Sequence, residues 1–143
     1  MPTSPLPDEL RDILAKPNPA VIATLRADGQ PVTVATWYLL DGDRILVNMD
    51  AGRKRVENLR QDPRVSITVL DTESWYRHVS IVGRLAEMND DPDLSGIDRL
   101  STHYMGNPYS NRDNARVNAW IEVERWHTWT GGRPMEVELE ARD

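Results

Sequence analysis

Two Asp-Gly turns divide the first part of this sequence into three short runs of strand-forming residues, and this pattern constrains the fold most. Residues 20–25 are mostly apolar, residues 32–40 are rich in β-branched and aromatic side chains, and residues 44–49 form a third run. Asp28-Gly29 separates the first two runs, and Asp41-Gly42 separates the last two. An Asp-Gly pair between two such runs is a strong hairpin signal. We therefore expect three antiparallel strands joined by hairpins.

The rest of the chain predicts more strands and a few short helices. Apolar residues at helical spacing predict helices over 8–14 and from about 90–93 onward, the second carrying Leu94, Ile97, Leu100 and Tyr104. Further strands are expected over residues 65–70, 78–88 and 116–129, with Gly83 typical of a bulge or bend. The sequence thus favours one domain, residues 1–143, built as a small antiparallel β-barrel.

The last expected strand carries two tryptophans on the face that should be polar. Alternation places Val117, Ala119, Ile121 and Val123 toward the core. The opposite face then carries Asn118, Trp120, Glu122, Glu124 and Trp126. An exposed aromatic pair usually meets a partner subunit or a ligand. The alternative is that barrel ends or helices cover both side chains.

A basic run stands where a helix should begin. Arg53, Lys54 and Arg55 precede two helical turns over 56–61, which Asp62-Pro63 ends. A helix N-terminus carries partial positive charge, so cations there are unfavourable by about 0.3–1 kcal/mol each. A docked, multiply charged anion would reverse that cost, because N–H groups and guanidinium forks would converge on it. The run predicts a phosphate site; the alternative is a solvated basic face without a ligand.

Composition excludes several classes of function. The net charge of −6 argues against general binding of nucleic acid or of a membrane surface, so the basic run suits a small anion better than a polymer. The absence of cysteine excludes disulfides, thiolate catalysis and cysteine–metal sites. No signal peptide or membrane-spanning run is apparent, and a cytoplasmic location is expected.

The protein itself offers little catalytic chemistry. His78, His103 and His127 lack metal-ligand spacing, and Asp90, Asp91 and Asp93 are typical of a helix start rather than of a metal site. No nucleophile elbow, Walker loop or dinucleotide-binding glycine motif is present. Any reaction is therefore expected to depend on a bound cofactor, without a metal.

The sequence resembles that of the flavin/deazaflavin split β-barrel superfamily, which includes pyridoxamine 5′-phosphate oxidase. The resemblance is carried by residues 20–31, the basic run and residues 58–66, in that order. Within this superfamily, the chain is most similar to the short, single-domain branch that uses the deazaflavin coenzyme F420. The resemblance covers about residues 8–129 and leaves 130–143 as a tail. It implies a mainly β (α+β) fold, a split antiparallel β-barrel of about six strands with two to four short helices. It also implies a homodimer with the cofactor in a groove between subunits.

The resemblance also implies the cofactor-binding residues. The phosphate-bearing tail would be held by Arg53, Lys54 and Arg55, and Arg60 or Arg77 would suit a polyglutamate extension. Trp75 would reach across from the other subunit, or would only pack in the dimer. The ring would lie along the second and third strands, against the main chain of Val32, Thr33, Val34, Asn48 and Met49.

The expected function is an F420-dependent reductase that transfers a hydride from reduced deazaflavin to an unsaturated organic acceptor. The first alternative is an FMN-dependent enzyme of the pyridoxamine 5′-phosphate oxidase type. That enzyme's additional C-terminal substrate residues are not evident in residues 125–129. The others are a non-catalytic flavin- or haem-binding protein and a purely structural dimerisation domain. No catalytic residue can be named from the sequence.

Overall fold

The computed structural model describes residues 6–130 and 133–138, and these form three helices and eight strands. The helices are α1 (Asp8–Leu14), α2 (Lys54–Gln61) and α3 (Ser95–Met105). The strands are β1 (Ala20–Leu25), β2 (Pro31–Thr36), β3 (Leu39–Asp41), β4 (Arg44–Asp50), β5 (Arg64–Leu70), β6 (His78–Asp90), β7 (Arg116–Thr130) and β8 (Arg133–Glu138).

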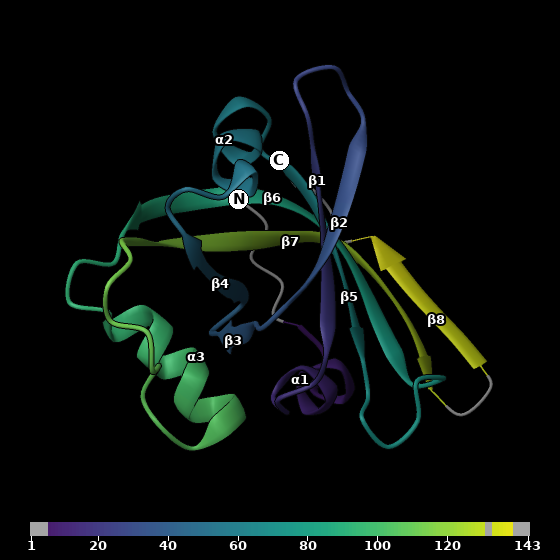
Figure 1. Ribbon diagram of the computed structural model, residues 1–143. Helices are drawn as coiled ribbons and strands as arrows, with labels where there is room; N and C mark the ends of the chain where they lie inside the picture. The colour runs from purple at the N-terminus through teal and green to yellow at the C-terminus, as the bar shows by residue number, and fades with distance from the viewer. Residues whose placement is uncertain (1–5, 131–132, 139–143) are drawn as a thin grey trace.

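All eight strands belong to one antiparallel sheet in the order β2-β1-β5-β6-β7-β4-β3, with β8 added to β7. The sheet curls strongly, but β2 and β3 at its two ends do not pair with each other, so the barrel is not closed (Figure 1). Both Asp-Gly turns join antiparallel neighbours, and Gly29 and Gly42 have the positive φ that such turns require. The expected split β-barrel with a mainly β, α+β fold is confirmed.

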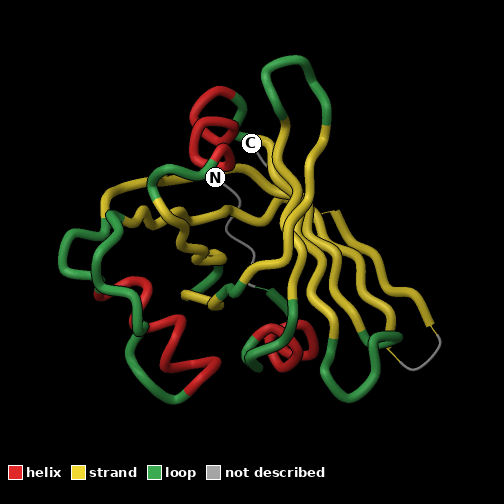
Figure 2. Tube along the Cα trace, in the orientation of Figure 1, coloured by secondary structure: helices red, strands yellow, loops and turns green. Residues whose placement is uncertain are grey.

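Helices close the curled sheet at opposite ends. The apolar face of α1 buries Leu10, Ile13 and Leu14 at one end, and α2 buries Val56 and Leu59 at the other (Figure 2). These side chains join one continuous core with the inward-facing residues of the strands. Burial of apolar surface of this kind is the main favourable term in folding. It fixes α2, and with it the basic run, over one end of the sheet.

Two strand predictions differ from the structure. The expected strand over 32–40 is two strands, because strand pairing is interrupted at Trp37 and Tyr38 between β2 and β3. There the buried Tyr38 hydroxyl donates to the Lys16 carbonyl at 3.0 Å. The segment from residue 130, expected as a tail, contains β8, which pairs with the end of β7; residues 139–143 lie outside the described chain.

A β-bulge beside Gly83 reverses the alternation of β7. Val82 pairs with Arg125 and Gly83 with Val123, so Glu124 is an extra residue on β7. Val117, Ala119, Ile121 and Val123 face the core as expected. Beyond the bulge it is Trp126 that points inward, with 4 % of its surface exposed. The prediction that Trp126 faces a partner or ligand is wrong for this reason.

Trp120 is covered by neighbouring strands. It is half-buried, its indole N–H donates to Asp41 at 3.0 Å, and the Arg44 guanidinium lies 5.4 Å from the ring centroid. The two tryptophans therefore do not share one face: Trp126 points into the core, and Trp120 is half-buried against residues of β3 and β4.

Replacing Gly83 by alanine should destabilise the fold. An added Cβ would overlap the Glu122 carbonyl oxygen, which is backbone and cannot move away alone. We expect Gly83→Ala to lower the free energy of unfolding by about 1–3 kcal/mol in urea denaturation. Gly52→Ala is the matched control, because its Cβ would meet nothing closer than 3.5 Å and should change stability little. Equal midpoints for the two variants would contradict the role given to the bulge.

Candidate functional site

The candidate site centres on Arg55, a half-buried arginine in the first turn of α2. Arg53 is the exposed N-cap residue of α2, and Arg55 lies two residues further on with its side chain under the helix. Within the described chain, the Nε and Nη1 atoms of Arg55 are buried and have no hydrogen-bond partner. Burial lowers the pKa of Arg55, and the nearby charges of Arg53 and Arg116 lower it further. Leaving these two donors desolvated without a partner is costly, and a bound anion would offset that cost.

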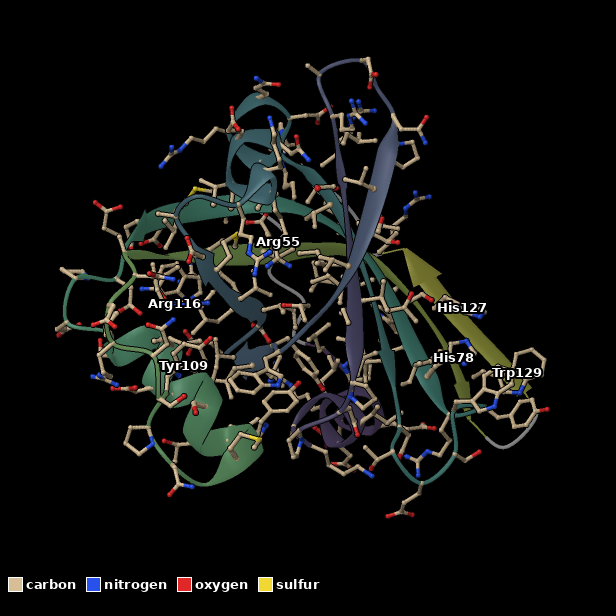
Figure 3. All side chains as sticks on the ribbon, viewed as in Figure 1. Arg55, His78, Tyr109, Arg116, His127 and Trp129 are labelled. Atoms are coloured by element: carbon tan, nitrogen blue, oxygen red, sulfur yellow. The ribbon has the colours of Figure 1, made fainter. Side chains whose placement is uncertain are left out.

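Arg116, at the start of β7, brings a third guanidinium to this region. The pairing of β7 with β4 sets Arg116 opposite Asp50, just before the turn that leads into α2. Its Nε donates to the side-chain oxygen of Asn48 at 2.8 Å, and its guanidinium lies 4.8 Å from the centroid of the Tyr109 ring. Figure 3 shows Arg55 projecting from α2 toward the sheet, with Arg116 and Tyr109 beside each other near α3.

Sequence reasoning missed Arg116. Only strand pairing brings it to the basic run, from which it is separated by a long stretch of chain, so no local spacing indicates the contact. Asp50 is a carboxylate close to Arg116 and Arg53. It is already engaged by the N–H of Gly52 at 3.0 Å and the amide of Asn114 at 2.8 Å. The Gly52 bond is the main cause that lowers the pKa of Asp50; the Asn114 bond and the charges of Arg116 and Arg53 also contribute.

Arg116 stands on the wall of a cleft of about 580 Å³ between α3 and the β1–β2 part of the sheet. Aromatic side chains form much of the cleft: Trp37 stacks on Tyr104 with centroids 5.2 Å apart, and Tyr109 meets Trp37 edge-on. Asn48, Arg116 and Thr36 are polar residues that line the cleft from the sheet, and only Arg116 is charged. The cleft is therefore apolar and aromatic along its length and cationic at one edge, a combination suited to a planar ring that carries an anionic tail. The remaining lining residues are Pro17, Pro19, Ala20, Ala35, Thr36, Ile97 and Leu100.

Two phenols hold this cleft in shape. Tyr104 donates its hydroxyl to the Asn18 carbonyl at 2.6 Å and accepts the backbone N–H of Tyr38 at 3.2 Å. Burial raises the pKa of Tyr104 to about 12 and raises the pKa of Tyr38 further still. Both hydroxyls therefore stay protonated and bonded to main-chain groups, and they act as braces between α3, β3 and the segment after α1.

Of the expected ring-binding residues, only Asn48 lines the cleft, and the others differ in exposure. Asn48 lines it, whereas the Met49 side chain is 1 % exposed in the core, so Met49 could offer a ligand only its main chain. On β2, Val32, Thr33 and Val34 lie on an edge strand, and Val34 is 47 % exposed.

Within one chain, the side chains of three other expected cations and of Trp75 are engaged or exposed away from Arg55. Lys54 is 90 % exposed, pairs with Glu57 at 3.8 Å and lines a separate hollow of about 530 Å³ with Arg26 and Val32. Arg60 is exposed late in α2, and Arg77 lies 3.7 Å from Asp71. Trp75, 61 % exposed, stacks on Tyr76 in the β5–β6 loop, at the end of the sheet away from α2 (Figure 1). Its placement near a cofactor therefore stays a prediction.

The acidic and histidine residues show no metal site among residues 6–130. Asp91 and Asp93 accept N–H groups at the start of α3, at 2.9 Å and 3.1 Å, as the helix-start interpretation predicts. His78 and His127 do approach each other, with ring centroids 6.1 Å apart (Figure 3). No described group of three or more potential ligands could hold a metal ion, and no described helix has the length and hydrophobicity to span a membrane.

Known structures share this fold. One similar structure is an F420 reductase, with a TM-score of 0.78 and 24% identity over 85% of this chain and 98% of that one. Another is the conserved hypothetical protein Rv2991 from Mycobacterium tuberculosis, with a TM-score of 0.72 and 27% identity over 90% and 86% of the two chains. A putative pyridoxamine 5′-phosphate oxidase from Listeria innocua has a TM-score of 0.64 and 19% identity, over 85% and 95%.

The family model described as pyridoxamine 5′-phosphate oxidase matches residues 6–130, which include the basic run, the cleft and all of β7. The match covers most of the chain, and the antiparallel split barrel agrees with it. The chain therefore belongs to the pyridoxamine 5′-phosphate oxidase family.

Proposed function

We propose that this protein is an oxidoreductase that uses the deazaflavin coenzyme F420 to reduce an unsaturated organic acceptor. The fold is the flavin-binding split barrel of its family, so a flavin or deazaflavin cofactor is the starting expectation. The observation that carries the proposal is that Nε and Nη1 of Arg55 are buried without a hydrogen-bond partner, beside Arg53 and Arg116 and next to an aromatic cleft.

The residues present fit such a cofactor. A ribityl phosphate would satisfy the buried donors of Arg55, with the N–H groups at the start of α2 and the guanidinium of Arg116 as further donors. The tricyclic ring would lie in the groove along β2 and β4, near Val34 and Asn48. When bound, reduced F420 supplies a hydride, and the protein's part is to position the acceptor and exclude water.

The choice of deazaflavin over FMN rests on two kinds of support. FMN also carries a ribityl phosphate, so Arg55 alone serves either cofactor. The F420 reductase has a higher TM-score than the putative pyridoxamine 5′-phosphate oxidase, 0.78 against 0.64. The exposed cations Arg53 and Arg60 on α2 would also suit the acidic tail that only F420 possesses. FMN remains the alternative that the first experiment separates.

That experiment is a titration of the purified protein with oxidised F420, with FMN as competitor, followed by tryptophan fluorescence. Micromolar or tighter binding of F420 with weak competition by FMN supports the proposal, and preference for FMN assigns the protein to the alternative. Binding of neither contradicts both. Turnover of reduced F420 with quinone and enone acceptors then separates a reductase from a carrier that binds without reaction.

Removal of the Arg55 charge should weaken binding without weakening the fold. We expect Arg55→Leu to raise the Kd for F420 by roughly tenfold or more, the loss of one or two charge-assisted hydrogen bonds. The Tm of the ligand-free variant should stay equal or rise, because an unpaired buried cation no longer has to be desolvated. Arg84→Leu, which removes an exposed arginine of β6, is the matched control and should leave the Kd unchanged. A lower Tm with an unchanged Kd for Arg55→Leu would identify Arg55 as structural.

In this proposed function the protein is a homodimer that pairs through its outer sheet face. We define that face by the side chains of β1, β5 and β6 that point away from the core: Val21, Ala23, Ser66, Thr68, Ser80 and Val82. None of these side chains is charged, and Val21 and Val82 are 37 % and 38 % exposed. Small, uncharged side chains on adjacent strands make a flat surface that a second copy can cover closely. Val82→Glu should therefore give monomers in light scattering, whereas Ser110→Glu, in an exposed loop, should stay dimeric.

A subunit-mixing experiment tests whether Trp75 serves the partner's site. Arg55→Ala and Trp75→Ala should each bind F420 weakly as homodimers. If Trp75 acts across the interface, each mixed dimer has one intact site and one doubly altered site, by two-fold symmetry. Unfolding and refolding the two variants together in equal amounts should then restore about one quarter of the high-affinity sites. No restoration would place Trp75 in its own subunit's site or in packing alone.

A further inference from the structure

A buried network links Arg116 to a carboxylate at the start of α3. Asp91 is 2 % exposed and accepts the side-chain amide of Asn48 at 3.1 Å. The same amide nitrogen donates to the side-chain oxygen of Asn118 at 2.7 Å, and the Asn48 oxygen accepts Nε–H of Arg116 at 2.8 Å. Asp91, Asn48 and Arg116 thus form a continuous chain of hydrogen bonds that ends at the wall of the cleft.

Asp91 determines which way the Asn48 amide points. An ionised carboxylate only accepts hydrogen bonds, so it must face the NH₂ group of Asn48 and leave the Asn48 oxygen for Arg116. If the amide turned over, its oxygen would face the Asp91 carboxylate and the Asn118 oxygen. Its NH₂ would then oppose Nε–H of Arg116, donor against donor. The carboxylate thus holds the NH₂ end of the amide and keeps its oxygen turned toward Arg116, the orientation that Nε–H of Arg116 also requires.

Asp91 is itself held rigidly. Its two oxygens accept the backbone N–H groups of Gly96 and Ile97, both at 2.9 Å, and its own N–H donates to the Arg116 carbonyl at 2.9 Å. Gly96 allows α3 to approach this closely, because a Cβ there would overlap the amide of Asn118. The carboxylate therefore has a fixed place between the helix and the sheet, and it cannot rotate away without breaking several bonds.

We infer that Asp91 is a positioning residue: through the Asn48 amide it fixes the Nε edge of Arg116, so that the opposite edge of the guanidinium stays directed to the anionic ligand. The inference rests on the proposed function, in that Arg116 serves the phosphate-bearing ligand there. Asp91 does not touch that ligand, and its effect passes through two hydrogen bonds.

The test variant is Asp91→Asn, which keeps the shape and removes the acceptor-only character. Its NH₂ group would face either the start of α3 or the Asn48 amide, which are both donors. We expect Asp91→Asn to raise the Kd for F420 about tenfold, the value of one charge-assisted bond. Asp93→Asn is the matched control: it also removes a carboxylate bond at the start of α3, to Ser95, but has no bond to Asn48. The control should keep the wild-type Kd at a comparable Tm.

A double-mutant cycle separates positioning from general loss of structure. If Asp91 acts through Arg116, then Asp91→Asn should add no further loss of affinity in the Arg116→Ala background. Equal losses in both backgrounds would overturn the inference, as would an unchanged Kd for Asp91→Asn alone. A wild-type protein that binds neither F420 nor FMN would overturn the proposed function instead.

A second measurement needs no ligand. In ¹⁵N-labelled protein, Nε–H of Arg116 should exchange slowly with water, because it is bonded to Asn48, and Asp91→Asn should accelerate that exchange. Asp93→Asn should not. Rapid exchange in the wild type, or equal exchange in the two variants, would show that Asp91 does not fix Arg116, whichever cofactor the protein binds.

Discussion

The pairing of β7 with both β6 and β4 is the interaction on which the rest of the structure depends. β7 is the longest strand; along most of its length it pairs with β6, and on its other edge it pairs first with β4 and then with β8. Bulges in the β6–β7 ladder bend the sheet, which lets a single sheet curl around the core. The same pairing sets Arg116 opposite Asp50 and so assembles the cationic edge of the cleft.

The cationic edge costs the ligand-free fold some stability. The α2 helix contributes Val56 and Leu59 to the core, and their burial holds the helix firmly over the sheet. Arg55 directly precedes Val56 and lies one helical turn before Leu59, so the packing of these two residues also fixes Arg55, whose Nε and Nη1 atoms are buried. Without such anchoring, an arginine would extend into water and keep its hydration. Apolar packing thus maintains an unpaired cation where it can interact strongly with an anion, since a desolvated site strengthens every charge interaction.

Local sequence signals predicted most of the fold, because hairpins and amphipathic helices depend on neighbouring residues. The Asp-Gly turns, the α1 face and the basic start of α2 all lie within short windows. The inward position of Trp126 could not be predicted by alternation, since the bulge exists only where Gly83 meets the Glu122 carbonyl. Arg116 and Asn48 are brought together only by the register of β4 and β7. The sequence therefore predicted the basic run and Asn48 but missed Arg116.

The neutral amide between Asp91 and Arg116 has a physical consequence for an anion site. A carboxylate bonded directly to Arg116 would orient the guanidinium equally well, but it would also neutralise the charge that a phosphate needs. The uncharged amide of Asn48 instead links the two groups by hydrogen bonds. It orients Arg116 and keeps the Asp91 carboxylate out of direct contact with the guanidinium. Two backbone N–H groups at the N-terminus of α3 donate to Asp91 and stabilise its negative charge. In the proposed function, the guanidiniums of Arg55 and Arg116 therefore keep their positive charge available to an anion, while that of Arg116 is held in a fixed orientation.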